Sequence, residues 1–193
     1  MAINPNIIKQ NYSIQLADRI EKNGHEPLVI WMTGLSGSGK STLANELQNQ
    51  LFKQNKQVYV LDGDNIRFGI NSDLDFSESG RIENIRRISE VAKLFVNAGF
   101  IVITAFISPF ETDREKAKEI IGPYFREIYI NADLKTCESR DVKGLYKKAR
   151  LGEIPNFTGL DSPFEIPRKP FITINTQNST IDECLEQLLS IIQ

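Results

Sequence analysis

One segment, residues 34–42, constrains the fold of this chain more than any other. It reads Gly-Leu-Ser-Gly-Ser-Gly-Lys-Ser-Thr and matches the phosphate-binding pattern G-x-x-x-x-G-K-[S/T] in full. Glycines let such a loop wrap its N–H groups around phosphate oxygens, and the loop joins a buried strand to the start of a helix. Residues 28–33 form an apolar run with strand character, and residues 41–53 have helical spacing. The segment therefore predicts a nucleotide-binding α/β domain.

The rest of the chain continues this alternation of strands and helices. Further strands are expected at residues 58–61, 100–107, 128–131 and 171–174, and further helices at 79–98, 112–121, 134–139 and 180–192. The strands are continuous apolar runs, as is typical when helices cover both faces of a parallel sheet. The pattern predicts a doubly wound, mainly parallel five-stranded sheet with helices on both faces.

Local signals fix the ends and faces of two of these helices. Thr180 and Glu183 form a capping-box pattern at the start of the last helix. Gly99 supplies a stop for the long helix at residues 79–98. One apolar face of that helix is predicted from Ile82, Ile85, Ile88, Val91, Ala92, Phe95 and Ala98.

Two parts of the chain differ from this pattern. Residues 1–26 are expected to be an N-terminal helical extension, and residues 27–193 a single domain of the phosphate-loop type. Residues 143–169 are rich in Gly, Pro and charge with few periodic positions, which predicts a long functional loop. Together with the basic residues from Arg140 onward, they are expected to form a mobile lid at about residues 140–169.

Composition excludes several function classes. The 23 basic and 25 acidic residues give a net charge of −2, which does not favour a nucleic-acid partner. Apolar runs are far shorter than the ~20 residues of a membrane span, so no membrane partner is expected. Cys137 and Cys184 match no metal-binding spacing and are expected to be buried thiols of a cytoplasmic protein. His25 is the single histidine, and no signature of a Ser-His-Asp triad accompanies it.

Each residue type in the loop has a chemical task. Lys40 is expected to reach the β- and γ-phosphates of ATP, and Ser41 to ligate Mg²⁺. The candidate ATP contacts in the loop are Gly34, Leu35, Ser36, Gly37, Ser38, Gly39, Lys40, Ser41 and Thr42. The chain lacks the Asn-Lys-x-Asp signature of GTPases, and its third strand does not end in an acidic residue. A kinase is therefore favoured over a GTPase or a motor-type ATPase.

Carboxylates follow the second expected strand, in the segment Leu-Asp-Gly-Asp-Asn-Ile-Arg at residues 61–67. Ligands of open parallel sheets bind beyond the carboxyl ends of the strands. Asp62 is thus placed to orient a hydroxyl nucleophile, to accept its proton or to hold Mg²⁺ through water. A solvated Asp-Gly turn is the alternative.

Several separated motifs resemble one family, the adenylylsulfate kinases (APS kinases). The resemblance runs from Trp31 to Thr176 and includes GLSGSGKST, LDGDNIR, FSESGRIENIRR at 76–87, FISPF at 106–110, RDVKGLYKKA at 140–149 and NFTG at 156–159. Members use ATP to phosphorylate the 3′-hydroxyl of adenosine 5′-phosphosulfate (APS), which gives 3′-phosphoadenylylsulfate (PAPS). The resemblance implies this activity, Mg²⁺ as cofactor, a role in sulfate assimilation and a homodimer.

The resemblance also implies an acceptor site. Arg67 and Arg81 are suited to clamp anionic groups, and Asn84 lies one turn after Arg81 on the same helix face. Phe76 and Phe157 are expected to sandwich the adenine of APS, with core packing as the alternative for either ring alone. Further expected contacts are Asp64, Ile107, Ser108, Lys143 and the Leu145 backbone for APS, and Arg140 near the base of ATP.

Alternatives remain for the role of Ser108, for two lysines and for the function as a whole. Ser108 occupies the position regarded in the family as a phosphoserine, but direct in-line transfer needs only positioning and charge neutralisation, so direct transfer is favoured. A plain turn residue before Pro109 is the alternative role for Ser108. Lys147 and Lys148 have the alternative of a solvated helix face. Phe68, Asp75 and Glu111 depart from the family pattern, and Glu111 is expected to weaken any anion binding at its position. A P-loop kinase of another small metabolite and a nucleotide-dependent switch are the alternative functions.

Overall fold

Five apolar runs of the chain pair as parallel strands. In the computed structural model, which describes residues 6, 8 and 10–192, these form a five-stranded sheet in the order β2-β3-β1-β4-β5. Every pairing is parallel, which confirms the predicted fold class. The strands are β1 (Leu28–Thr33), β2 (Val58–Asp62), β3 (Ile101–Ala105), β4 (Phe125–Asn131) and β5 (Ile172–Asn175).

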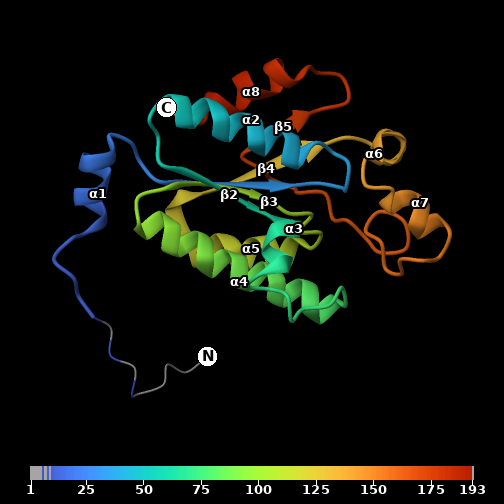
Figure 1. Cartoon of the computed structure of the whole chain (residues 1–193), viewed down its shortest axis with the longest axis horizontal. Coiled ribbons are helices and arrows are strands. Elements are labelled where there is room, and N and C mark those ends of the chain that lie inside the picture. Colours follow the sequence, from blue (N-terminus) through green and yellow to red (C-terminus); the bar gives the residue numbers. More distant parts are fainter. Residues whose placement is uncertain (1–5, 7, 9, 193) are drawn as a thin grey trace.

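Helices cover both faces of the sheet, as Figure 1 shows. The helices are α1 (Leu16–Asn23), α2 (Lys40–Lys53), α3 (Gly63–Phe68), α4 (Glu78–Asn97), α5 (Glu111–Ile121), α6 (Leu134–Arg140), α7 (Leu145–Arg150) and α8 (Ile181–Leu189), with a short 3₁₀ turn at Gly122–Tyr124. α2 and α8 lie on one side of the sheet, and α4 and α5 lie on the other. α6 and α7 extend beyond the carboxyl ends of the strands.

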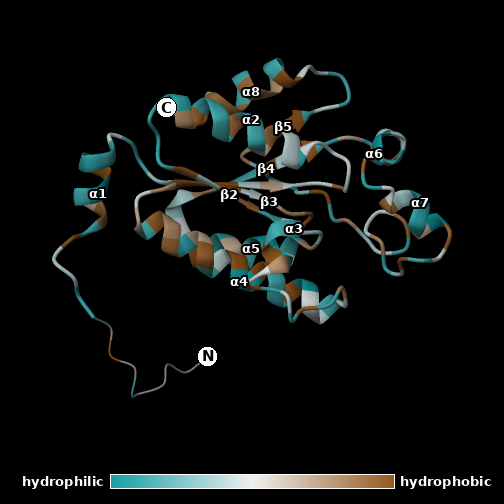
Figure 2. Cartoon of the chain, viewed as in Figure 1, coloured by the Kyte–Doolittle hydropathy of each residue, from teal (hydrophilic) through white to brown (hydrophobic). Residues whose placement is uncertain are grey.

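Two hydrophobic cores result, one on each face of the sheet. Along β1, Ile30 and Met32 pack towards α2 and α8, whereas Val29 and Trp31 pack towards α4 and α5. All four side chains are fully buried. The hydropathy colouring in Figure 2 shows apolar strands between helices whose outer faces are largely hydrophilic. A strand buried on both faces is what the continuous apolar runs predicted.

Two short helices were not predicted. α3 begins directly after Asp62, whose side chain accepts a hydrogen bond from Asp64 N at 3.0 Å and so caps the helix. α7 lies inside the stretch predicted to be a loop without helical pattern, so that prediction is wrong there. The Asp141 carboxylate accepts bonds from the backbone N–H groups of Tyr146 and Lys147, both at 3.0 Å. Six-residue helices complete too few turns to display a periodic apolar face.

Several predicted boundaries and one predicted face also differ. β3 ends at Ala105 rather than at residue 107, because the chain turns into a left-handed conformation at Ser108, with φ of +39°. On α4, Ile82 is 36% exposed, so the predicted apolar face is wrong at its first turn. Val96 is fully buried but was absent from the predicted face. Gly99 follows the helix with φ of +85°, as expected of a C-terminal stop.

The ends of the chain are described in part. The capping box of Thr180 and Glu183 is present, and α8 ends at Leu189, earlier than predicted. α1 forms within the predicted N-terminal extension, of which residues 1–5, 7 and 9 lie outside the described residues. In the described part of the chain, no helix combines the length and apolar character needed to cross a membrane.

Candidate active site

The phosphate loop, residues 34–42, connects β1 to α2 and has the conformation that its glycines predict. Gly34 and Gly37 have φ of +152° and +76°. A side chain at Gly34 would collide with the carbonyl of Ile130, and one at Gly37 would lie 2.7 Å from the carbonyl oxygen of Cys137. Glycine is therefore required where the loop passes closest to β4 and α6. α2 begins at Lys40, so its N-terminal end faces the loop.

Lys40 lies inside the loop rather than in solvent. Its side chain is buried, and Nζ donates hydrogen bonds to Gly34 O at 2.8 Å and Leu35 O at 2.7 Å. Burial lowers the pKa of Lys40 from 10.5 to about 8, and electrostatic interactions with Cys137 and Asp62 partly offset this shift. The ammonium group thus occupies the centre of an anion-binding loop, where the chain's own carbonyl groups satisfy it.

A hydrogen bond between Ser41 and Asp62 joins the start of α2 to the end of β2. Ser41 Oγ, in the first turn of α2, donates a hydrogen bond of 2.7 Å to Asp62 Oδ2 at the end of β2. Mg²⁺ in kinases is held by one or two protein oxygens together with substrate phosphates, and a hydroxyl beside a carboxylate fits that donor set. Ser41 would ligate the ion directly, and Asp62 would hold it through water.

Side chains of α6 and of the segment after β5 hydrogen-bond to backbone carbonyl groups of the phosphate loop. Arg140, at the end of α6, donates to Gly37 O at 3.3 Å and to Thr176 O at 2.7 Å. Thr176 Oγ1 in turn donates to Ser38 O at 2.7 Å. Thr176 was not predicted as a site residue, although its position directly after the last strand was a usable signal. Thr42, the last loop residue, is exposed.

Arg67 lies in α3, directly after β2, and Arg81 lies in the first turn of α4. The Arg67 guanidinium stacks over the exposed Phe76 ring, with its carbon 4.2 Å from the ring centre. Arg67 also donates to the Leu74 and Asp75 carbonyls, at 3.0 and 3.2 Å.

Arg81 joins two loops that are far apart in sequence. It donates to Phe76 O at 3.1 Å, to Thr158 Oγ1 at 2.9 Å and to Ser162 Oγ at 3.3 Å. A further bond goes to Asn156 O. Burial lowers the pKa of Arg81, with a smaller raising effect from Asp161.

Phe157 and Asn84 are less accessible than their predicted roles suggest. Phe157 is 8% exposed and packs edge-to-face on Tyr146, with ring centres 4.9 Å apart. Core packing, the alternative, therefore describes its contacts here, and the adenine sandwich with Phe76 stays a prediction. Asn84 is also buried, and its Oδ1 accepts a bond of 2.9 Å from Nδ2 of Asn71, a residue that the sequence patterns did not single out.

Ser108 is enclosed in the turn that follows β3. It is 2% exposed, and its Oγ accepts a hydrogen bond of 3.2 Å from Trp31 Nε1. The preceding residue, Ile107, accepts a bond of 2.7 Å from Thr33 Oγ1 through its carbonyl. The turn is thus fastened to β1, the strand that leads into the phosphate loop.

Comparison with known proteins identifies the family of this chain. A model of the family described as Adenylylsulphate kinase matches residues 26–175. The chain belongs to this family. It is 53% identical to an adenylyl-sulfate kinase of Geotalea daltonii over 97% of this chain and 93% of that protein. It is 55% identical to an adenylyl-sulfate kinase of Prochlorococcus marinus, over 96% and 92% of the two chains.

A solved member of the family has the same fold. The structure of the Mycobacterium tuberculosis APS kinase CysC in complex with AMPPNP and APS matches with a TM-score of 0.83 and 42% identity. The match covers 86% of this chain and 98% of that chain. The chain is therefore a kinase of the adenylylsulfate kinase family, and the resemblance seen in the motifs is confirmed.

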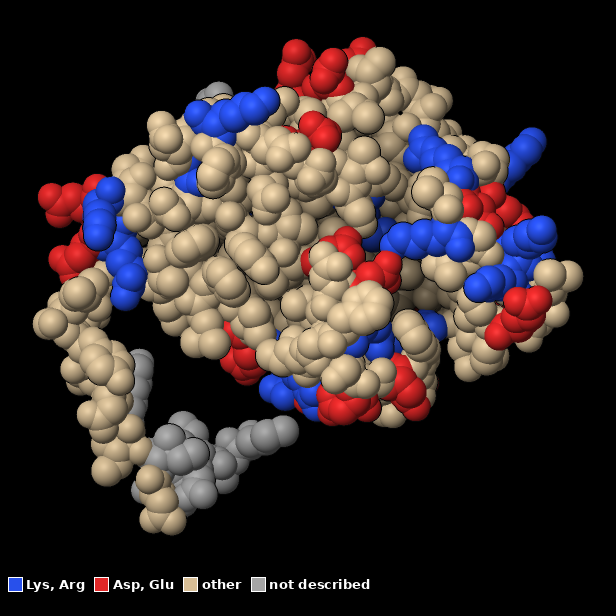
Figure 3. All heavy atoms as spheres, viewed as in Figure 1, with Lys and Arg blue, Asp and Glu red and all other residues tan. Residues whose placement is uncertain are grey.

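The basic segment at residues 140–150 borders the site. Lys143 forms an ion pair with Asp64 of α3, and both side chains are more than half exposed. Leu145 begins α7, and Lys147 and Lys148 of that helix are exposed, which agrees with the solvated alternative. Figure 3 shows basic side chains gathered around a hollow between this part of the molecule and its body.

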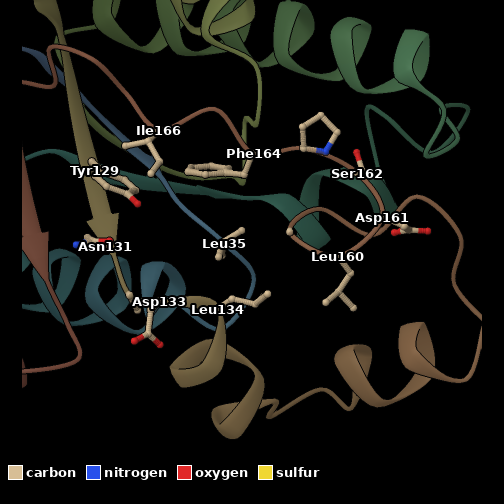
Figure 4. Close-up of a pocket in the computed structure, with 13 residues that line it drawn as sticks. Leu35, Tyr129, Asn131, Asp133, Leu134, Leu160, Asp161, Ser162, Phe164 and Ile166 are labelled. Atoms are coloured by element: carbon tan, nitrogen blue, oxygen red, sulfur yellow. The ribbon is translucent and has the colours of Figure 1, made fainter.

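A cavity of about 670 Å³ lies beside the phosphate loop. Leu35 of the loop, Leu134 of α6 and Phe164 of the later loop converge on it, as Figure 4 shows. Phe164 stacks on Tyr129 of β4, with ring centres 6.0 Å apart. The segment at residues 159–166 thus forms one wall of the space next to the phosphate loop.

Proposed function

We propose that this chain transfers the γ-phosphoryl group of ATP to the 3′-hydroxyl of APS and releases PAPS and ADP. Membership in the adenylylsulfate kinase family supports this reaction. The main structural support is the contact between Ser41 and Asp62. It places the carboxylate expected to orient the acceptor hydroxyl directly beside the phosphate loop. This chain also carries the motifs DGDNIR, FISP and KGLYKKA, which serve a second substrate and have no use in a nucleotide-dependent switch.

The phosphate loop binds the donor in this account. Backbone N–H groups of residues 34–42 and the Lys40 ammonium hold the β- and γ-phosphates, while Arg140 and Thr176 keep the loop in shape behind them. When bound through Ser41, Mg²⁺ neutralises charge on those phosphates. Lys40 leaves the carbonyls of Gly34 and Leu35 to meet the phosphate oxygens.

Asp62 orients the acceptor hydroxyl and takes its proton. Its carboxylate lies at a strand end beside the loop, and Asp64 N holds Oδ1 in place at 3.0 Å. Arg67 and Arg81 bind the anionic phosphosulfate group, and Asn84 contributes an amide hydrogen bond. Phe76 offers an exposed ring face to the adenine.

Ser108 contacts the acceptor without forming a phosphoenzyme. Its burial and its hydrogen bond to Trp31 Nε1 support direct transfer, because a phosphoserine would need room for three more oxygens at that position. Lys143 and the Leu145 backbone close over the substrates when the basic segment moves, which excludes water from the γ-phosphate.

The biological setting is part of the proposal. The product suggests a role in sulfate activation and assimilation, with the enzyme acting as a homodimer. Cys137 and Cys184 are both buried free thiols, which supports a reducing, cytoplasmic location. A P-loop kinase of another small metabolite is the alternative function.

A coupled assay of ADP release tests the reaction. APS, adenosine 5′-monophosphate and sugar acids are supplied in turn as acceptors, with ATP and Mg²⁺ in excess. APS is expected to stimulate ADP release well above the rate of ATP hydrolysis without acceptor. Stimulation by another acceptor and none by APS would assign the chain to the alternative.

A further inference from the structure

Arg114, a buried arginine outside the predicted site, connects three separate parts of the chain. It lies in the first turn of α5 and is 2% exposed. Nε donates to Glu127 Oε1 of β4 at 2.6 Å, Nη1 donates to Ser108 O at 2.8 Å, and Nη2 donates to Glu165 O at 2.9 Å. A buried guanidinium is tolerated only when its charge and donors are satisfied. Glu127 supplies the opposite charge, and the two carbonyl groups each accept a hydrogen bond from one terminal nitrogen.

One of these contacts stabilises an unusual backbone conformation. Ser108 has φ of +39°, which residues with a side chain rarely adopt. Its carbonyl oxygen accepts bonds from both Arg114 Nη1 and Thr33 Oγ1, the latter at 3.3 Å. In this conformation Ser108 Oγ meets the Trp31 indole. Arg114 thus helps to set where the Ser108 hydroxyl lies.

The other terminal nitrogen of Arg114, Nη2, binds the loop at residues 156–165, which also contacts the proposed acceptor-binding residue Arg81. Besides the bond to Arg114, Glu165 donates through its backbone N–H to Pro109 O at 2.9 Å. Its carboxylate accepts a bond of 2.6 Å from the backbone N–H of Glu111. Thr158 and Ser162, earlier in the same loop, accept bonds from Arg81. The turn at Ser108 and the loop that holds Arg81 are therefore fastened together through Arg114.

We propose that Arg114 is a positioning residue for the acceptor nucleotide. It fixes the turn at Ser108 relative to the loop at residues 156–165, so that Ser108 and Arg81 face one bound acceptor. All three of its side-chain hydrogen bonds go to this turn, this loop and β4, rather than to the phosphate loop. None of these bonds reaches the phosphate loop directly, so we expect the larger effect on acceptor binding and an affinity for ATP close to that of wild type. The inference rests on the proposed function, because APS is the acceptor in question.

Arg114→Lys tests the proposal, because it keeps the charge beside Glu127 and removes the fork that reaches the two carbonyl groups. We expect the KM for APS to rise about tenfold or more, a loss typical of misplaced binding groups. The Kd for ATP, measured without acceptor, is expected to stay within about twofold of wild type. Arg126→Lys is the matched control, since Arg126 lies on the same strand as Glu127 and donates to the Pro123 and Phe125 carbonyls. It should change neither constant.

The single tryptophan gives a readout that does not depend on activity. Trp31 donates to Ser108 Oγ, so its fluorescence in the ligand-free protein reports the position of the turn. Arg114→Lys is expected to shift this emission, and Arg126→Lys is not. The shift is measurable even if wild type shows no APS-dependent ADP release, a result that would refute the proposed function separately.

A paired variant covers the case in which Arg114→Lys fails to fold. Arg114→Met combined with Glu127→Met removes both charges, which buried ion pairs often tolerate. It should show the same selective rise in the KM for APS. Equal weakening of APS and ATP in the folded variants, or an unchanged KM for APS with unchanged Trp31 emission, would overturn the proposal.

Discussion

The hydroxyl of Ser41 donates a hydrogen bond of 2.7 Å to the carboxylate of Asp62. Ser41 belongs to the first turn of α2, directly behind the phosphate loop, whereas Asp62 ends β2 on the acceptor side. The carboxyl ends of β1 and β2, which lead to these two residues, are not adjacent in the sheet, because β3 lies between the two strands. This contact links the proposed donor and acceptor sites directly.

Asp62→Asn removes the proton acceptor and keeps the size of the side chain. An amide oxygen still caps α3, so the melting temperature should change little. The kcat is expected to fall about 100-fold or more, because a positioned general base contributes at least that much. Steady-state kinetics and thermal unfolding measure the two effects.

Asp133→Asn is the matched control for this change. Asp133 caps α6 by accepting a bond of 2.7 Å from Thr136 N, in the same way that Asp62 caps α3. It should retain wild-type kcat. A kcat of Asp62→Asn within about threefold of wild type would remove Asp62 from the catalytic mechanism.

The lowered pKa of Lys40 predicts a pH dependence of ATP binding. The free protein loses the ammonium charge as the pH rises through about 8, so its affinity for ATP should fall above that pH. Titration calorimetry with ATP between about pH 6.5 and 9.5 measures this. Lys40→Arg is the control, since a guanidinium stays charged across that range. An identical pH profile for the two proteins would contradict the assignment.

The same residue predicts how stability changes with pH. The unfolded chain keeps the Lys40 proton up to the ordinary pKa of 10.5, whereas the folded chain releases it near 8. Between these values the unfolded state binds more protons, so the contribution of Lys40 to the free energy of unfolding rises with pH. Denaturant unfolding of wild type and Lys40→Met at the two ends of this window isolates that contribution. A difference between the two proteins that does not change with pH would contradict the lowered pKa.

Ser108→Ala separates direct transfer from a phosphoenzyme. Loss of the hydroxyl leaves the buried Trp31 N–H without its acceptor, which should cost about 1–3 kcal/mol of stability. Direct transfer predicts that the folded variant retains kcat within about tenfold of wild type. A phosphoserine intermediate predicts that turnover disappears. Radiolabelled ATP would then label Ser108 of wild type at the rate of turnover, the outcome that would refute direct transfer.

Lys143→Ala tests whether the basic segment binds the acceptor. The ion pair of Lys143 with Asp64 is well exposed, so its loss should cost under about 1 kcal/mol of stability. The KM for APS is nevertheless expected to rise, because Lys143 supplies a cation over the bound substrates. Lys147→Ala, at an exposed position of α7, is the comparison variant and should leave the KM unchanged. Equal KM values for the two variants would place Lys143 outside the site.

The sequence predicted the sheet because its strands carry a strong and simple signal. β1 is apolar at every buried position before Thr33, on both faces of the sheet, and the phosphate loop that follows it admits few other folds. Boundaries were harder where a side chain or a turn decides them. α3 depends on the Asp62 cap and α7 on the Asp141 carboxylate, and neither helix is long enough to show periodicity.

The candidate site was predicted where chemistry fixes a motif and missed where partners come from distant segments. Lys40, Ser41 and Asp62 follow from patterns that phosphate chemistry requires. Arg114 gave no such signal, because its role depends on Glu127, Ser108 and Glu165 meeting in space. Asn71 is similar, since only the folded chain brings its amide group to Asn84. The burial of Phe157 against Tyr146 was also outside the reach of local sequence.

Identification of the phosphorylated product tests the central claim most directly. Wild-type protein is incubated with ATP, Mg²⁺ and APS, and the nucleotide product is analysed by ³¹P NMR and mass spectrometry. The account predicts a new phosphomonoester on the 3′-oxygen of APS, formed in equal amount to ADP, and no product from 3′-deoxy-APS. Undiminished phosphorylation of 3′-deoxy-APS, or ADP formation without any phosphorylated APS, would contradict it.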